Sequence, residues 1–223
     1  MQENHRTKLV LFDLDGTLID TAPDFLESLN NVLRKHNKDC VSMDEIRPHI
    51  SEGTSKLIKL FFKINENDKS FNLYKNQFLL EYELNLTNNS SLFEGMSDFI
   101  KFLDKESIQY GVVTNKYYKY AQPILDSFLE LKNMKVLICP DHVNNSKPDP
   151  EGILQACKKL DIKPENAIYL GDHLNDIKAG ICAGVKTIAC LYGYSINKNE
   201  IDCMKCSQVK KVDEIQSFII KWI

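Results

Sequence analysis

Apolar residues form one short continuous run near the N-terminus and a longer helical pattern after it. Residues 9–12, Leu-Val-Leu-Phe, contain no polar position, and Leu14 follows them closely. Such a run predicts a strand that is buried on both faces, as in a parallel sheet. From Asp20 to about Thr87, apolar residues recur every three or four positions, and this spacing predicts helices and no strand.

After residue 91 the pattern changes to short apolar runs that alternate with helical stripes. Strands that alternate with helices predict right-handed βαβ units and a parallel sheet. We therefore expect an α/β fold: a Rossmann-like three-layer core of residues 1–19 and 88–223, with a small all-helical domain of residues 20–87 inserted after the first strand. The further strands are predicted at 110–114, 136–139, 167–170 and 187–191, and the helices at 117–128, 150–160, after 171 as far as 183, and at 213–222, with one more capped by Ser97.

Composition places the chain among ordinary globular proteins, with 43% hydrophobic and 26% charged residues in a length of 223. The net charge of −3 provides no basic field, so neither nucleic acid nor an anionic membrane is an expected partner. No apolar run approaches the roughly 20 residues of a membrane helix, and no leader precedes the first strand, so a cytoplasmic location is expected. The seven cysteines are expected to be free thiols, because Cys203 and Cys206 have no second pair or histidine beside them to form a zinc site.

Acidic residues follow two of the predicted strands. Asp13 and Asp15 end the first strand, and Gly16 after them permits a sharp turn. Asp172 and Asp176 follow the strand at 167–170 and stand about one helical turn apart. The first pair is compatible with a merely acidic turn, but neighbouring carboxylates repel each other unless a cation separates them or one is protonated. They could instead bind Mg2+, or act as a nucleophile and a proton carrier.

Two further stretches carry groups that are suited to phosphate. Thr114 and Asn115 end the second predicted strand and offer a hydroxyl and an amide. Lys147 precedes the sequence Pro148-Asp149-Pro150, whose prolines restrict the backbone around it. Each stretch alone is also compatible with an ordinary loop, because a threonine often follows a strand and a lysine in a proline turn is usually solvated.

These four stretches, in this order, resemble the four motifs of the haloacid dehalogenase superfamily, most of whose members are phosphatases. The resemblance implies that Asp13 is the nucleophile and Asp15 the general acid and base. It also implies a sheet order of 5-4-1-2-3 for the predicted strands, which brings all four motifs to one edge, and a helical domain that closes over the site as a cap. The remaining implied roles are phosphate binding by Thr114, Asn115 and Lys147, Mg2+ binding by Asp13, the backbone carbonyl of Asp15 and Asp172, and a supporting role for Asp176.

The reaction that this resemblance implies is Mg2+-dependent hydrolysis of a small phosphorylated metabolite through an aspartyl phosphate, by a monomer or a homodimer. A dehalogenase of the same fold typically lacks the second acid, so Asp15 disfavours that alternative. A non-catalytic binding module would tolerate the loss of Asp13, Lys147 or Asp172, all of which are present. A phosphomutase keeps both acids and a similar cap, and this alternative stays open.

Within the superfamily, the chain length, the cap position and the sequence Tyr192-Gly193-Tyr194 resemble the phosphoglycolate phosphatase group. Residues 92–96, 111–116 and 137–151 more specifically resemble bacterial phosphatases that act on N-acetylmuramic acid 6-phosphate in peptidoglycan recycling. This substrate is therefore favoured, with 2-phosphoglycolate as the alternative. Selection of the substrate is expected from small residues of one cap loop, namely Ser51, Gly53 and Thr54.

Overall fold

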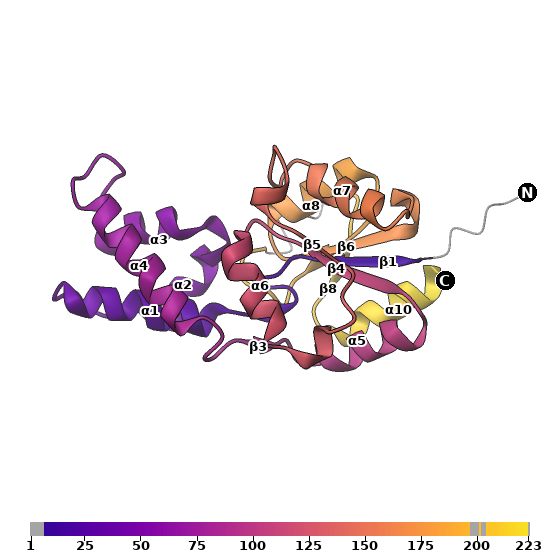
Figure 1. Cartoon of the computed structure of the whole chain (residues 1–223), viewed down its shortest axis with the longest axis horizontal. Helices are drawn as coiled ribbons and strands as arrows, with labels where there is room; N and C mark the ends of the chain where they lie inside the picture. The colour runs from indigo at the N-terminus through magenta and orange to yellow at the C-terminus, as the bar shows by residue number, and fades with distance from the viewer. Residues whose placement is uncertain (1–6, 197–200, 202–203, 223) are drawn as a thin grey trace, which may run out of the picture.

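A parallel sheet forms the centre of the fold (Figure 1), as seen in a computed structural model that describes residues 7–196, 201 and 204–222. Its strand order is β5-β4-β1-β6-β7-β8, and every neighbouring pair is parallel. The predicted order 5-4-1-2-3 is therefore confirmed, and β8 is an additional strand that the sequence pattern did not predict. The strands of this sheet are β1 (Leu9–Phe12), β4 (Gln109–Val113), β5 (Val136–Ile138), β6 (Ala167–Gly171), β7 (Lys186–Cys190) and β8 (Ser207–Val209).

Helices cover both faces of this sheet, which explains the continuous apolar run of β1. Because successive side chains of a strand point to opposite faces, Val10 and Phe12 lie in one apolar core, and Leu9 and Leu11 lie in another. The predicted three-layer α/β core is thus confirmed. The first face is covered by α5 (Met96–Lys105), α6 (Tyr118–Asp126) and α10 (Asp213–Trp222), and the second by α7 (Glu151–Lys159) and α8 (Leu174–Ala183).

The helices predicted after the first strand are present and have an apolar core of their own (Figure 1). In that core the rings of Phe25 and Tyr82 lie with their centroids 4.3 Å apart, and Phe78 stacks against Tyr82. We call these elements the helical insert. They are α1 (Ala22–Lys35), α2 (Met43–Ile46), the 3-10 helix η1 (Arg47–Glu52), α3 (Thr54–Phe62) and α4 (Phe71–Asn85).

Two short strands join the helical insert to the sheet. β2 (Ile19–Asp20) and β3 (Ser91–Leu92) pair in antiparallel orientation. Near them, the fully buried Asp24 of α1 accepts hydrogen bonds of 2.7 and 3.1 Å from the backbone N–H groups of residues 89 and 90. The prediction of no strand from Asp20 onward is wrong at this first residue, because Asp20 pairs with the returning chain. The boundaries of the domains at 19/20 and 87/88 stay a prediction.

The start of α5 also differs from the prediction. The helix begins at Met96, and its N-cap is Gly95, so Ser97 lies inside the first turn and is not the cap. Gly95 has a φ of +82°, and a Cβ there would lie 2.6 Å from Asp213 Oδ1. Glycine is favoured at this position because it adopts positive φ without strain and occupies no further space.

The described cysteines are free thiols, and Cys139, Cys157 and Cys190 among them are buried. This agrees with the prediction of free thiols, although Cys203 lies outside the described residues and its relation to Cys206 is therefore not part of the structure. Among the described residues, no helix combines the length and the apolar character that crossing a membrane requires.

Candidate active site

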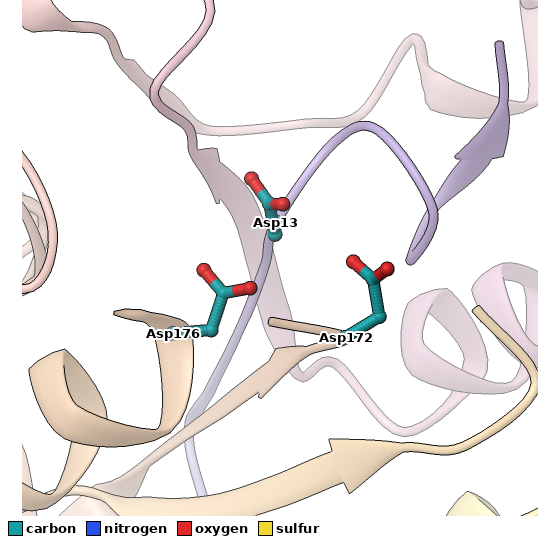
Figure 2. A group of neighbouring side chains, drawn as sticks. All are labelled: Asp13, Asp172 and Asp176. Atoms are coloured by element: carbon teal, nitrogen blue, oxygen red, sulfur yellow. The ribbon is translucent and has the colours of Figure 1, made fainter. Parts of the chain in front are cut away.

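Three buried carboxylates meet where β1 and β6 end (Figure 2). Asp13 follows β1, Asp172 follows β6, and Asp176 lies in the first turn of α8. Because β1 and β6 are neighbouring parallel strands, the residues that follow them reach the same edge of the sheet. Each residue offers one oxygen atom, and these oxygens all lie within 4.8 Å of one another. We call Asp13, Asp172 and Asp176 the aspartate cluster.

Burial and mutual repulsion disfavour the charged forms of the carboxyl groups in this cluster. Desolvation and the charge of Asp176 raise the pKa of Asp13 to about 7, although Lys147 acts in the opposite direction. Burial, Asp176 and Asp13 likewise raise the pKa of Asp172. Burial lowers the pKa of Lys147, but Asp13 and Asp176 outweigh it, so the pKa of this lysine is raised and its ammonium persists. A donor set of three carboxylates without histidine or cysteine suits a hard divalent cation, and the residues present therefore fit Mg2+.

Lys147 is held between two members of the aspartate cluster. Its Nζ donates to Asp13 Oδ1 at 2.7 Å and to Asp176 Oδ1 at 2.6 Å. A third hydrogen bond, of 2.9 Å, runs from Nζ to the hydroxyl of Tyr169, and the lysine side chain is only 4% exposed. The side-chain amide of Asn115 fixes the backbone of Lys147 through two further hydrogen bonds. The ammonium therefore has one defined position beside Asp13.

The loop after β1 packs directly against Asp172. Thr17 Oγ1 donates to Asp172 Oδ1 at 3.1 Å, and the backbone N–H of Tyr194 donates to Asp172 Oδ2 at 2.8 Å. Gly16 has a φ of +83°, and a Cβ there would lie only 2.5 Å from Asp172 Oδ2. Glycine is therefore required after Asp15 for two reasons, the positive φ and the close approach of the carboxylate.

The side chain of Asp15 is engaged by two groups outside the aspartate cluster. Lys116 Nζ lies 2.8 Å from its Oδ1 and 3.0 Å from its Oδ2. Thr21 Oγ1 donates to Oδ1 at 2.5 Å. The carboxylate thus has a fixed orientation. The backbone carbonyl of Asp15, which the sequence predicts as a metal ligand, is a separate group, and its role stays a prediction.

Thr114 directly follows β4, which ends at Val113, so the strand predicted at 110–114 stops one residue earlier than expected. Thr114 is buried, its N–H donates to the carbonyl of Ile138 at 3.0 Å, and its Oγ1 accepts from the N–H of Lys116 at 3.1 Å. Both Thr114 and Asn115 therefore shape the loops of this edge. Phosphate binding by either residue stays a prediction.

Comparison with known proteins assigns the family of this chain. Residues 10–190 match the haloacid dehalogenase-like hydrolase family. The chain belongs to this family. The match extends from β1 to the end of β7, and so it includes the helical insert and the loops that carry the aspartate cluster.

Relatives of this haloacid dehalogenase-like hydrolase are phosphatases. An N-acetylmuramic acid 6-phosphate phosphatase of Pseudomonas putida is 40% identical over 189 residues, which is 85% of either chain. A phosphoglycolate phosphatase of Xanthomonas campestris pv. campestris is 32% identical over 193 residues, 86% of this chain and 87% of that one. The crystal structure of a predicted phosphoglycolate phosphatase from Haemophilus somnus gives a TM-score of 0.85 at 27% identity and covers 95% of this chain and 97% of that one. This hydrolase is a phosphatase, and its reaction class is phosphoric monoester hydrolysis.

The residues predicted to select the substrate of this hydrolase lie where η1 gives way to α3 in the helical insert. Ser51 Oγ is buried and has no hydrogen-bond partner among the described residues. Gly53 has a φ of +86°, and Thr54 begins α3. Within the described part of the chain, no hydrogen bond or ion pair joins these three residues to the aspartate cluster. Their role in specificity stays a prediction.

Sequence reasoning missed several residues that contact the site of this hydrolase. The apolar run at 167–171 contained an indication, because a tyrosine buried there needs a partner for its hydroxyl, and Tyr169 finds one in Lys147. In the sequence, Tyr194 stood out only because residues 192–194 resemble the phosphoglycolate phosphatase group. In the structure its hydroxyl donates to Asp20 at 2.6 Å, and its N–H donates to Asp172. The contacts of Lys116 and Thr21 with Asp15 had no local indication in the sequence.

Proposed function

We propose that this phosphatase cleaves its ester through a covalent phosphate on Asp13. The observation that carries the proposal is the position of Lys147 Nζ, 2.7 Å from Asp13 Oδ1 and inside the buried aspartate cluster. The ammonium stabilises the carboxylate form of Asp13, which is the nucleophile, and provides positive charge for the phosphate oxygens. Asp13 bonds to phosphorus as the substrate oxygen leaves, and water then cleaves the aspartyl phosphate to release inorganic phosphate.

We assign Mg2+ as the cofactor of this reaction. Asp13, Asp172 and the backbone carbonyl of Asp15 would hold it, and Asp176 would support the site by binding Lys147. Bound Mg2+ supplies positive charge that offsets the repulsion between a carboxylate and a phosphate. The assignment is supported by the oxygen-only donor set and by the raised pKa values of Asp13 and Asp172, which reflect burial first and then repulsion between neighbouring carboxylates.

Proton transfer is assigned to Asp15. In the first step it would protonate the leaving oxygen, and in the second it would take a proton from the attacking water. Its fixed orientation supports this role, because a general acid has to present one oxygen to the reacting atom. The phosphate oxygens would be bound by Lys147 together with Thr114 and Asn115. The helical insert would cover the site and exclude bulk water.

The proposed substrate is N-acetylmuramic acid 6-phosphate. Support comes from the higher identity to the Pseudomonas putida enzyme, 40% against 32% for the phosphoglycolate phosphatase of Xanthomonas campestris over comparable spans. The small residues Ser51, Gly53 and Thr54 of the helical insert are proposed to leave room for the amino sugar. 2-Phosphoglycolate is the second candidate, because the Haemophilus somnus structure resembles this chain along almost its whole length. The phosphomutase that the sequence left open would use the same acids but return the phosphate to the substrate, and the phosphatases among the relatives disfavour it.

The test is to measure kcat/KM of the purified protein with Mg2+ for both esters, together with the release of inorganic phosphate. We expect preference for N-acetylmuramic acid 6-phosphate and stoichiometric release of phosphate. Preference for 2-phosphoglycolate would overturn the substrate and leave the chemistry intact, whereas an isomerised ester without free phosphate would identify a mutase. Asp13→Asn should abolish turnover without loss of the fold, and near-native activity of this variant would overturn the mechanism.

A further inference from the structure

Lys116 places a buried ammonium at the junction of the sheet and the helical insert. Its backbone belongs to the loop after β4, whereas its Nζ lies 2.8 and 3.0 Å from the two carboxylate oxygens of Asp15. The same Nζ lies 4.6 Å from the ring centroid of Phe25 and 4.8 Å from that of Tyr82. The lysine side chain is only 6% exposed. One cation is therefore enclosed by a carboxylate of the sheet domain and two aromatic faces of the insert.

This enclosure fixes the lysine far more firmly than a surface ion pair would. An exposed lysine exchanges between its partner and water, which makes such pairs weak. Here water is largely excluded, and the ring faces attract the ammonium that Asp15 also binds. Thr21 Oγ1 holds Asp15 Oδ1 from another direction at 2.5 Å. Two fixed donors thus define the orientation of the Asp15 carboxylate.

We propose that Lys116 is a positioning residue that orients Asp15 for proton transfer, and that Phe25 and Tyr82 of the helical insert hold Lys116 in place. The inference rests on the proposed role of Asp15 as general acid. It adds a residue to the proposed mechanism and gives the insert a second task besides covering the substrate. Phe25 belongs to α1 and Tyr82 to α4. Asp15 therefore has its defined orientation only when the insert is packed against the sheet domain.

The choice of leaving group separates this role from a merely structural one. An alkyl phosphate releases a strongly basic alkoxide and needs a proton from Asp15, whereas p-nitrophenyl phosphate releases a stabilised phenolate and needs little help. The value of kcat/KM reports only the steps up to the transfer of phosphate to Asp13. Misplacement of Asp15 should therefore lower kcat/KM for an alkyl ester much more than for the aryl ester.

The experiment compares wild type and Lys116→Met on one aryl ester, p-nitrophenyl phosphate, and on one alkyl ester. The alkyl ester is N-acetylmuramic acid 6-phosphate or 2-phosphoglycolate, depending on which of them wild type cleaves faster. We expect kcat/KM for the alkyl ester to fall by about 10²-fold and that for the aryl ester by less than about threefold. Lys116→Arg, which keeps the cation, should restore part of the alkyl activity. Equal losses on both esters, or no loss on the alkyl ester, would overturn the proposal.

Lys119→Met is the matched control. Lys119 lies three residues after Lys116, in the first turn of α6, its side chain is 61% exposed, and its ion pair with Glu83 spans 3.9 Å. Its replacement should leave kcat/KM unchanged for both the alkyl and the aryl ester.

The link to the insert is tested at Tyr82, so the proposal stays testable even if Lys116→Met fails to fold. The Tyr82 hydroxyl has no hydrogen-bond partner in the described part of the chain, so Tyr82→Phe should behave like wild type. Tyr82→Leu removes the ring face and should reproduce the selective loss on the alkyl ester. Loss on both esters in Tyr82→Leu, or selective loss in Tyr82→Phe, would contradict the proposed link.

Failure of wild type to cleave any ester, or activity of Asp13→Asn, would instead overturn the proposed function, so the two failures are distinguishable.

Discussion

Asn115 is hydrogen-bonded in both directions to the backbone of Lys147. Its Nδ2 donates to the Lys147 carbonyl at 2.9 Å, and its Oδ1 accepts from the Lys147 N–H at 3.1 Å. This pair joins the loop after β4 to the loop that carries the lysine. The position of the ammonium beside Asp13 therefore depends on an amide that belongs to a different strand.

Asn115→Ala should lower kcat/KM because Lys147 loses its backbone anchor. Two hydrogen bonds of about 1 kcal/mol each correspond to roughly a 30-fold effect on the rate. If Asn115 acts through Lys147, the loss should be far from additive with that of Lys147→Ala in a double-mutant cycle. Additive losses would show instead that Asn115 binds phosphate independently of the lysine.

Mg2+ should bind more tightly as the pH rises from about 6 to about 8, because Asp13, with a pKa raised to about 7, has to lose a proton to bind a cation. The raised pKa of Asp172 acts in the same direction. Titration calorimetry at the two pH values measures this effect directly.

Asp172→Ala should weaken the response of activity to Mg2+, and a chelator should abolish activity in wild type. Full activity in metal-free buffer would rule out the site.

The metal-free protein should lose stability as the pH rises from about 4 to about 7. The folded state raises the pKa of Asp13 from 3.8 to about 7, so across this window the folded chain binds more protons than the unfolded chain. Stability falls with pH wherever the folded state binds more protons. Urea midpoints in the presence of a chelator measure the trend, and the difference between wild type and Asp13→Asn isolates this carboxyl. A difference that does not change between pH 5 and pH 8 would contradict the prediction.

Exchange of the segment from Ser51 to Thr54, where η1 gives way to α3, should change which ester is cleaved and spare p-nitrophenyl phosphate. The physical reason is the proposed division of labour, in which the sheet edge binds the phosphate and the insert contacts the rest of the substrate. The measurement is kcat/KM for three esters on the exchanged and the parent protein. Equal losses on all three would show that this segment serves folding or closure of the insert.

Sequence reasoning succeeded where one strand and its end determine the outcome. The carboxyl ends of neighbouring parallel strands meet at one edge, so the approach of Asp13 to Asp172 follows from the strand order. It failed where a contact depends on how two separate units pack. Asp15 and Lys116 are 101 residues apart, and their contact is completed by rings from the insert. No periodicity within either segment contains that information.

The short strand β8 was missed for a different reason. Its residues, Ser207 to Val209, include two polar side chains and resemble a loop, yet they pair with β7 at the edge of the sheet. An edge strand has only one neighbour, so its apolar pattern is weaker than that of a central strand such as β1. Tertiary pairing, not local propensity, determines this element.

The pairing of Ile19 with Leu92 places the chain's exit from the sheet domain beside its return. The helical insert is therefore connected like a cassette, through two junctions that lie at one point of the fold. Exchange of this cassette between relatives replaces none of the aspartates of the sheet edge, provided that the new insert keeps the aromatic rings that hold Lys116 against Asp15. A lineage of such enzymes can acquire new substrates by replacing one contiguous stretch of gene, and a protein engineer can follow the same route with two crossover points.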